Sequence, residues 1–298
     1  MRIQHSSCPA CQSSRIQHKY DVKDHSVSGE VFPVWICLTC RFMFTQQIPD
    51  AASIGPYYQS NAYVSHTDTR EGLINRLYHL VRNLTLQSKK KLMVRSTQKP
   101  KGTLLDLGCG TGAFLKVMHD AGWQVQGLEP DDAAAKIARE RSGLQVDKPE
   151  NLHALQSESF DAITLWHVLE HVHTLTEYLQ TLHRILKKDG VLFIAVPNHT
   201  SLDARHYQEA WAAYDVPRHL YHWSPESMQL MLEKHGFELV DKRPMWFDAF
   251  YVSMLSEPYL TGKKNLLKAI WVGIRSNLAA MRNKDRCSSV IYIIRKAA

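Results

Sequence analysis

The sequence lacks the features of several specialised protein classes. Its 298 residues contain no run near the roughly 18 consecutive apolar residues that a membrane-spanning helix needs. The first residues, MRIQHSSCPAC, have neither the charged start nor the apolar stretch of a secretory signal peptide. An apolar fraction of 44% and a charged fraction of 22% are ordinary for a globular chain and exclude a disordered one. We therefore expect a globular, cytoplasmic protein.

The sequence also lacks any block of five like charges, and its net charge of +7 is spread unevenly. Residues 70–101 hold nine Lys or Arg and one acid, residues 262–298 hold the same numbers, and residues 102–261 hold 22 acids and 13 bases. Basic flanks can attract phosphates, nucleic acid or anionic lipid. They are also typical of the solvated faces of amphipathic helices. We favour that interpretation and do not expect a nucleic-acid partner.

Cysteine is scarce outside two C-x-x-C pairs, which are formed by Cys8, Cys11, Cys37 and Cys40. In a cytosolic chain such pairs favour metal binding over disulfides, and four thiolates make a closed tetrahedral Zn²⁺ site. The segment VFPVWICLTCRFMF indicates a strand, a cysteine knuckle and a second strand. This is the pattern of a zinc ribbon, predicted over residues 1–48. Gln12 and Arg41 stand where such knuckles usually carry glycine for a turn with positive φ.

Residues 49–101 are expected to connect the ribbon to the next domain. A turn-rich stretch, IPDAASIGPYYQSNAYVSHTD, comes first. Apolar residues from Leu73 to Leu84 then recur at helical spacing, which predicts one basic amphipathic helix over about 71–95. The segment STQKPKG ends it.

The segment TLLDLGCGTGAFLKVMHDAGW indicates a strand, a glycine turn and a helix. Gly108, Gly110 and Gly112 allow a sharp turn and a close approach of the backbone to a ligand, and the following helix N-terminus points free N–H groups at that ligand. A second strand ends at Glu129, where an acid can bind the two vicinal hydroxyls of a ribose. A dinucleotide site would need G-x-G-x-x-G, whereas this run is D-x-G-x-G-x-G.

This run resembles motif I of the class I S-adenosylmethionine (SAM) methyltransferases, and later segments extend the resemblance in the family's order. They are Glu129, FDAI at 160–163, HVLEH at 167–171 and RILKKDGVLFIAVPN. HVLEH is similar to the E-x-x-E-H of the ubiquinone-biosynthesis O-methyltransferases. The resemblance implies a Rossmann-like, doubly wound α/β fold with a seven-stranded, mostly parallel sheet. The methyltransferase domain would span 102–298, with substrate-side insertions near 199–225 and 258–286.

The same resemblance implies SAM as the cofactor and S-adenosylhomocysteine as its product. The backbone at Gly108, Cys109 and Gly110 would cradle the methionine part of SAM. Asp106 would orient that turn or meet the amino group, and Glu129 would bind the ribose. The remaining cofactor contacts would be Gly112, Pro130, Asp131, Glu150, Asn151, Trp166 and His167.

His167, Glu170 and His171 fall at i, i+3 and i+4, so on a helix they would share one face and could hold a divalent metal. We favour the alternative that Glu170 and His171 brace a helix start while His167 lines the pocket. A neutral His167 could accept a proton from the substrate.

The phrase PRHL-YHW recurs in this methyltransferase group and would form the substrate-side wall. Substrate contacts are expected from Tyr207, Arg218, His219 and Tyr221, and the candidate general bases are His167, His219 and His222. Ser224 and Pro225 predict the start of a helix. Beyond it, PMWFDAFYVSMLSEPYL predicts a strand. NLLKAIWVGIRSNLAAMRNK predicts an amphipathic helix that either covers the sheet edge or lies on a membrane surface.

Three functions remain open. The first is methylation of a small-molecule acceptor at oxygen or carbon, the acceptor being a quinol, phenol, sugar or lipid-like compound, and we favour this one. The second is methylation of RNA gripped by the ribbon and the basic flanks. That function would need an N-P-P-Y-like base-flipping motif at the end of strand four, but this strand ends in LWHV. The third is SAM binding without catalysis, against which the intact glycine turn and Glu129 argue.

Overall fold

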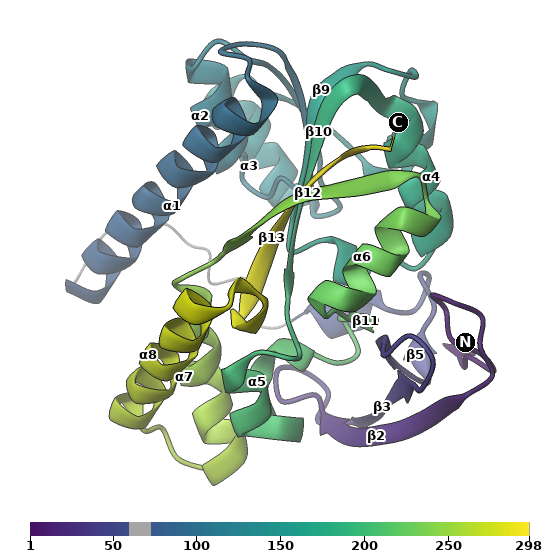
Figure 1. Cartoon of the computed structure of the whole chain (residues 1–298). Helices are drawn as coiled ribbons and strands as arrows, with labels where there is room; N and C mark the ends of the chain where they lie inside the picture. The colour runs from purple at the N-terminus through teal and green to yellow at the C-terminus, as the bar shows by residue number, and fades with distance from the viewer. Residues whose placement is uncertain (60–72, 298) are drawn as a thin grey trace.

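The computed structural model describes residues 1–59 and 73–297, and a seven-stranded sheet lies at its centre (Figure 1). Its strands are β6 (Thr103–Leu107), β7 (Gln124–Leu128), β8 (Gln145–Asp147), β9 (Phe160–Trp166), β10 (Leu186–Pro197), β12 (Phe237–Pro244) and β13 (Ser289–Lys296). They lie in the order β12-β13-β10-β9-β6-β7-β8, and all run parallel except β13, which is antiparallel to β10 and β12. The predicted seven-stranded, mostly parallel α/β sheet is confirmed.

Helices cover both faces of this sheet. On one face lie α1 (Leu73–Thr97), α2 (Ala113–Asp120) and α3 (Asp132–Ser142), and on the other lie α4 (Leu175–Ile185) and α6 (Pro225–Lys234). Successive residues of β6 explain the two layers: Leu104 belongs to the same core cluster as Phe114 of α2, and Leu105 to that of Leu179 of α4. Since side chains alternate along a strand, a strand covered on both sides must be apolar at consecutive positions.

The helix predicted over about 71–95 is present as α1. The first two residues of the predicted range, 71 and 72, lie outside the described residues. The connector's residues 60–70 lie outside them as well. Short 3₁₀ helices join the larger elements: η1 (Gly55–Tyr58), η2 (Pro149–Ala154), η3 (Leu169–His171), η4 (Gln208–Ala210), η5 (Ala212–Tyr214) and η6 (Lys284–Arg286). The helix start predicted at Ser224 is confirmed, because Ser224 caps α6 and Pro225 is its first residue.

The N-terminal segment forms a second sheet that also uses a strand from the C-terminal half. β2 (Ile16–Lys23), β3 (Val31–Cys37) and β4 (Met43–Thr45) are followed at the edge by β11 (Tyr221–His222), in the order β11-β4-β3-β2. A separate pair joins β1 (Arg2–Ile3) to β5 (Ile48–Pro49). The PRHL-YHW segment therefore completes the sheet of the predicted ribbon.

Between β12 and β13 the chain forms a helical hairpin, and one sequence expectation is wrong there. The predicted strand PMWFDAFYVSMLSEPYL is instead α7 (Asp248–Thr261), which packs with α8 (Leu266–Arg282) and α5 (Leu202–Tyr207). Its buried residues, among them Ala249, Val252 and Ser256, recur at helical spacing. A Cβ on Gly273 of α8 would lie 2.6 Å from Cδ1 of Phe250, so the two helices approach closely. The prediction of a strand is wrong because tertiary packing, and not β propensity, decides the conformation of this apolar segment.

In the described part of the chain, no helix combines the length and the apolar character that crossing a bilayer requires.

Candidate functional site

The glycine turn after β6 has the geometry of a ligand cradle. Gly108, Gly110 and Gly112 all have positive φ, of 64°, 56° and 75°. A Cβ on Gly108 would lie 2.6 Å from Cγ2 of Val168, and one on Gly112 would lie 2.9 Å from Cβ of Ala138. Nothing lies within 4 Å of a Cβ on Gly110. Packing thus requires two of the glycines, while the third faces open space where a ligand can approach the backbone.

Glu129, at the end of β7, holds this turn in place. Its buried carboxylate accepts hydrogen bonds from the N–H of Gly110 at 2.7 Å and from the N–H of Asp131 at 2.9 Å. Burial raises the pKa of Glu129, and the two backbone N–H groups oppose that rise. A carboxylate offers about four lone-pair positions, so acceptors remain for ribose hydroxyls. The sequence predicted the ribose contact but not this second role.

Asp106 provides a buried carboxylate beside the turn. It accepts a hydrogen bond from Oγ1 of Thr164 at 2.6 Å. Burial raises its pKa to about 7, although the Thr164 hydroxyl and the charge of Lys89 act in the opposite direction. This placement agrees with the predicted contact to the cofactor's amino group, which stays a prediction.

Lys89 of α1 is a site residue that sequence reasoning missed. Its Nζ lies 4.0 Å from the ring centroid of Trp166, a cation–π contact. Burial lowers the pKa of Lys89 to about 8, against the raising effect of Asp106 and Asp248. An ammonium between an aromatic face and two acids shows that this place accepts a cationic group. The only sequence signal was the Lys89-Lys90-Lys91 cluster, which says nothing about the pocket.

These residues fit the cofactor that the resemblance implies. SAM carries a positive sulfonium and an ammonium, and the site offers the Asp106 carboxylate, the free acceptors of Glu129 and the open space over Gly110, while Lys89 covers the face of Trp166. The complementarity is therefore both steric and electrostatic.

The other predicted cofactor residues lie around the ends of the same strands. Cys109 is buried, and burial raises the pKa of its thiol, as expected of a small packing residue. Pro130 and Asp131 are exposed after β7, where Asp131 caps α3 by accepting the N–H of Ala134 at 2.7 Å. Glu150 and Asn151 are exposed in η2, after β8. Their contacts to the adenine remain predictions.

His167 follows β9 with a positive φ of 59° and lies between two carboxylates. Its Nδ1 is 3.4 Å from Oε1 of Glu170 and its Nε2 is 3.2 Å from Oδ2 of Asp248. Burial would lower the pKa of His167, but these two carboxylates outweigh burial and raise it to about 10. A ring that carries its proton at neutral pH donates hydrogen bonds. The expectation of a neutral, proton-accepting His167 is thus corrected.

The expected helical face of His167, Glu170 and His171 does not form, because Leu169–His171 is a single 3₁₀ turn. Instead, one ligand atom from each of Glu170, His171 and His219 lies within 4.8 Å of the others. Glu170 is fully buried, and apart from its ion-pair contact with His167 neither carboxylate oxygen has a hydrogen-bond partner.

A backbone carbonyl orients the imidazole ring of each histidine in this cluster. Nδ1 of His171 is 2.9 Å from the carbonyl oxygen of Arg218, and Nδ1 of His219 is 2.8 Å from that of Ala213. Metal-binding histidines commonly donate their second nitrogen to such carbonyls, which directs the first nitrogen at the metal. Burial and the charge of His219 lower the pKa of His171 to about 4, so its ring is neutral, as metal binding requires. Glu170, His171 and His219 could therefore hold a divalent cation.

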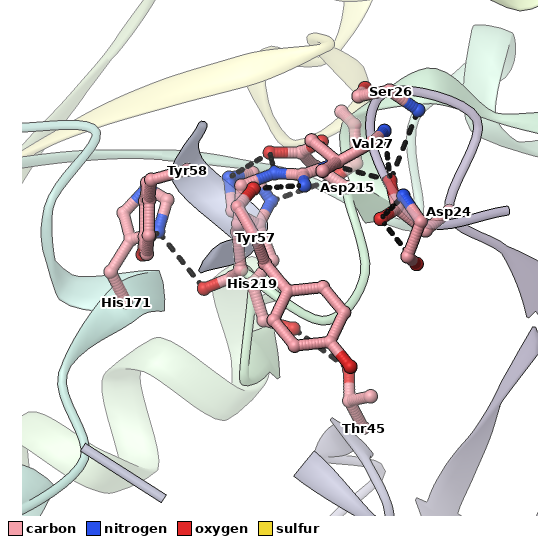
Figure 2. Close-up of polar contacts among 12 residues, drawn as sticks. Asp24, Ser26, Val27, Thr45, Tyr57, Tyr58, His171, Asp215 and His219 are labelled. Atoms are coloured by element: carbon pink, nitrogen blue, oxygen red, sulfur yellow. Dashed lines mark hydrogen bonds and ion pairs between the residues drawn. The ribbon is translucent and has the colours of Figure 1, made fainter. Parts of the chain in front are cut away.

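Arg218 was expected on a substrate wall, but the structure gives it a different role. Its side chain is 1% exposed and forms ion pairs with Asp24 at 3.0 Å and Asp215 at 2.6 Å. It also donates to the carbonyl oxygen of Tyr57 at 2.7 Å. Figure 2 shows Asp24, Asp215 and Tyr57 gathered at this point. Arg218 thus joins the N-terminal segment to the loop before β11, and its guanidinium has protein partners in place of a substrate.

The remaining expected substrate and base residues pack in the same region. Nε2 of His222 is 3.0 Å from Oγ1 of Thr45, and burial lowers its pKa well below the usual value. Tyr221 is buried in β11, and the hydroxyl of Tyr207 donates to Glu257 at 3.0 Å. Their partners belong to the ribbon and to α7. Of the predicted bases, His167 and His219 lie next to Glu170, whereas His222 contacts Thr45 of the ribbon.

The four N-terminal cysteines converge as predicted. Sγ of Cys8 is 3.6 Å from Sγ of Cys40, Cys11 and Cys37 are separated by the same distance, and all four sulfurs lie within 4.8 Å of one another. A tetrahedral zinc with Zn–S bonds of about 2.3 Å separates its sulfurs by about 3.8 Å. A disulfide needs about 2.05 Å, so the four thiols are free to bind a metal.

Both cysteine knuckles close in the same way. The N–H of Gln12 donates to the carbonyl oxygen of Cys8 at 2.9 Å, and the N–H of Arg41 to that of Cys37 at 3.0 Å. Gln12 has φ of 63° and Arg41 has φ of 60°. The positive φ that the pattern predicts is confirmed, although neither residue is glycine. The donor set and the spacing fit zinc.

Comparisons with known proteins identify the family. A family model described as a methyltransferase domain matches residues 77–242, more than half of the chain, and the chain belongs to that family. The chain is 39% identical over 109 residues to the ubiquinone biosynthesis O-methyltransferase of Actinobacillus pleuropneumoniae, covering 33% of this chain and 46% of that protein. It is 30% identical over 164 residues to the human mitochondrial enzyme of the same name, covering 49% and 44%. The chain thus spans less than half the length of these two relatives.

A solved structure shows the same fold. It is described as a sarcosine dimethylglycine methyltransferase of Galdieria sulphuraria, and it superimposes with a TM-score of 0.52 at 15% identity, covering 75% of this chain and 88% of that one. At this identity the similarity concerns the fold alone.

Replacing Glu129 by Ala should weaken binding of S-adenosylhomocysteine about tenfold to hundredfold. The change removes the charged acceptor for the ribose and leaves the N–H of Gly110 without its partner, a loss of roughly 1.5–3 kcal/mol. Calorimetric titration measures it. Glu140→Ala, an exposed acid on α3, is the matched control and should bind normally. Unchanged affinity in Glu129→Ala would mean that the ribose binds elsewhere.

Replacing Arg218 by Met should lower the free energy of unfolding by about 3–5 kcal/mol, since Asp24 and Asp215 would lose their buried counter-charge. Thermal unfolding with zinc held at a fixed concentration measures the effect. Arg15→Met removes an exposed arginine of the same ribbon and should change little. Equal midpoints for the two variants would refute the structural role of Arg218.

Proposed function

We propose that this protein is a SAM-dependent methyltransferase that acts on a small-molecule acceptor. The observation that carries the proposal is the cradle itself: three glycines of positive φ, fixed by Glu129, beside the buried Asp106. The relatives named as ubiquinone biosynthesis O-methyltransferases support a hydroxyl acceptor of the quinol or phenol type. A carbon nucleophile on a sugar or lipid-like acceptor is the alternative.

SAM supplies a methyl group on a positively charged sulfur, and its transfer is an in-line displacement. The chain's own residues bind and align the reactants, a contribution of up to roughly 7–11 kcal/mol in favourable cases. Glu129 and the glycine turn fix the nucleoside end, while Asp106 meets the ammonium. Lys89, which lies over Trp166, must give way to a cationic ligand or share the site with it.

A hydroxyl acceptor must also lose a proton. His167 already holds its proton between Glu170 and Asp248, so it is suited to orient the acceptor or to stabilise negative charge. The proton would pass to the carboxylate of Glu170, which lies beside His171 and His219. Apart from the contact with His167, its oxygens have no hydrogen-bond partner among the described residues. A divalent cation there would lower the pKa of a bound hydroxyl.

An assay with radiolabelled SAM tests the proposal directly. We expect methyl transfer to small phenols, quinols or sugar derivatives, and little transfer to total RNA. Any RNA binding through the basic flanks should be weak and fall with salt, with a log–log slope of about −0.7 per neutralised phosphate on single strands. Transfer of the radiolabel to RNA, with none to the small molecules, would overturn the choice of substrate.

We further propose two metal sites, zinc on Cys8, Cys11, Cys37 and Cys40 and a second divalent ion on Glu170, His171 and His219. Two imidazoles and one carboxylate favour a transition metal or zinc over magnesium. Because zinc would hold the small ribbon together, the free energy of folding of the ribbon should depend on bound metal.

Elemental analysis of protein purified without chelator should find two equivalents of metal per chain when the second metal is supplied. Cys37→Ser combined with Cys40→Ser should remove one equivalent, and His219→Ala should remove the other. His235→Ala, a histidine directly after α6 and outside both clusters, is the control. Retention of both equivalents in His219→Ala would refute the second site.

We also propose that the α7–α8 hairpin associates with an anionic lipid surface. The buried face of α8 carries Val272 and four small residues, namely Ala269, Gly273, Ser276 and Ala280. Its large apolar residues point outward: Leu266, Leu267, Ile270, Trp271, Ile274, Leu278 and Met281, of which Leu267 is 82% exposed. A helix that only covered a sheet edge would bury its large residues.

Charge complementarity identifies the lipid surface as the occupant. No acid occurs from residue 258 to residue 284, while Lys263, Lys264 and Arg275 lie on or beside the hairpin; Lys268 is paired with Glu257 of α7 at 2.9 Å. The Arg275 guanidinium lies 4.5 Å from the ring centroid of Trp271. Apolar residues flanked by bases are typical of helices that lie in the interface of anionic membranes.

Vesicles containing phosphatidylglycerol should sediment the protein, and vesicles of phosphatidylcholine alone should do so much less. Leu267→Glu combined with Trp271→Glu should abolish sedimentation, because it removes the apolar contact and adds repulsion. Leu230→Glu, an exposed leucine of α6, is the matched control. A hairpin variant that still sediments would refute the proposal.

A further inference from the structure

A cavity lies between the ribbon and the methyltransferase domain, away from the glycine turn. Its volume is about 440 Å³, within the range of about 300–1,000 Å³ typical of pockets that hold small molecules. Four separate segments line it: the second cysteine knuckle, the loop and helix after β10, the start of α6, and η6. The residues that matter here are Arg41, His199, Arg205, Glu226, Asp285 and Arg286.

The cavity carries an excess of positive charge. Within residues 1–59 and 73–297, the guanidinium groups of Arg41, Arg205 and Arg286 make no hydrogen bond or ion pair with another residue. Two acids also line the cavity. Asp285 is paired with Lys242, which leaves Glu226 as the acid without a cationic partner. Three unpaired guanidiniums therefore face one unpaired carboxylate.

His199 adds a polar group whose hydrogen bond is missing. Its Nε2 is buried and has no hydrogen-bond partner among the residues that the structure describes. Burial, together with the charges of Arg41 and Arg205, lowers the pKa of His199 to about 4, so its ring is neutral. A neutral imidazole can offer one N–H to a ligand in the cavity without adding charge.

Arg41 occupies a position that glycine would fill without strain. Its φ of 60° lies in the left-handed region, which L-residues other than glycine rarely adopt. The ribbon therefore carries an arginine at the edge of this cavity despite the backbone cost. Strain of this kind is often found where the side chain serves a function.

We propose that this cavity binds the phosphate or diphosphate group of a small-molecule ligand. Guanidinium groups match phosphate oxygens with two parallel hydrogen bonds, and three of them converge here from segments far apart in the sequence. The ribbon thereby contributes Arg41 to a binding site.

The place of the cavity in the fold suggests which ligand this is. His199 and Arg205 follow the carboxyl end of β10, and β10 is separated from β6 and its glycine turn by β9 alone. Two strand spacings of about 4.8 Å amount to roughly 10 Å across the sheet. A methyl acceptor with an anionic end in the cavity can thus reach toward the cofactor. This assignment to the acceptor rests on the proposed function.

Calorimetric titration with inorganic pyrophosphate tests the site in the zinc-loaded protein saturated with S-adenosylhomocysteine. We expect one binding site per chain. Arg41→Gln, Arg205→Gln and Arg286→Gln should each weaken binding about tenfold or more, as loss of a charge-assisted contact predicts. Arg15→Gln, an exposed arginine of the ribbon outside the cavity, is the control. All variants should bind S-adenosylhomocysteine normally, which shows that they are folded.

Absence of pyrophosphate binding, or equal binding by all variants, would overturn the proposal. Phosphatidylglycerol vesicles distinguish two sources of phosphate. Variants that lose pyrophosphate binding but keep vesicle binding indicate a soluble phosphate ester, and loss of both indicates a lipid headgroup. Pyrophosphate binding without any methyl transfer would refute the proposed enzyme function while leaving the phosphate site intact.

Discussion

The buried guanidinium of Arg218 is the interaction on which the arrangement of the ribbon and the candidate catalytic cluster depends. It neutralises Asp24 of the ribbon and Asp215 of the loop before β11, and it holds the connector through the carbonyl of Tyr57. The carbonyl of Arg218 in turn lies 2.9 Å from Nδ1 of His171. One residue thus links the ribbon to the histidine that lies beside Glu170. A buried charge of this kind is stable only while all of its partners remain in place.

The carboxyl edge of the sheet gathers three environments that differ in charge. Around β6 and β7 the backbone cradle and two carboxylates favour a cationic cofactor. After β9, the half-buried ring of His167 pairs with the fully buried carboxylate of Glu170. Beyond β10 the cavity with Arg41 and Arg205 favours an anion. A methyl acceptor with a nucleophile near its middle and a phosphate at one end would match the order of these three environments across neighbouring strands. This agrees with the proposed methyl transfer and with the proposed phosphate site.

The ribbon and the α7–α8 hairpin are the parts that distinguish this chain from a bare methyltransferase domain. The ribbon's sheet needs β11, a strand contributed by residues 221 and 222, so the ribbon packs as part of the whole molecule. The hairpin instead turns its large apolar side chains outward and packs inward through Ala269 and Gly273. The ribbon would thus shape the substrate side of the site, while the α7–α8 hairpin would place the protein at a lipid surface.

The sequence by itself determined the features that depend on local stereochemistry. Gly108, Gly110 and Gly112 predicted a turn of positive φ, consecutive apolar residues predicted a strand covered on both faces, and the C-x-x-C spacing predicted the knuckles. Only the tertiary structure decided that Lys89 lies over the ring of Trp166, that His219 joins Glu170 and His171, and that α7 is a helix. Asp24 and Arg218 are 194 residues apart. Such pairings depend on which surfaces meet when the chain closes, and no local pattern of residue types contains that information.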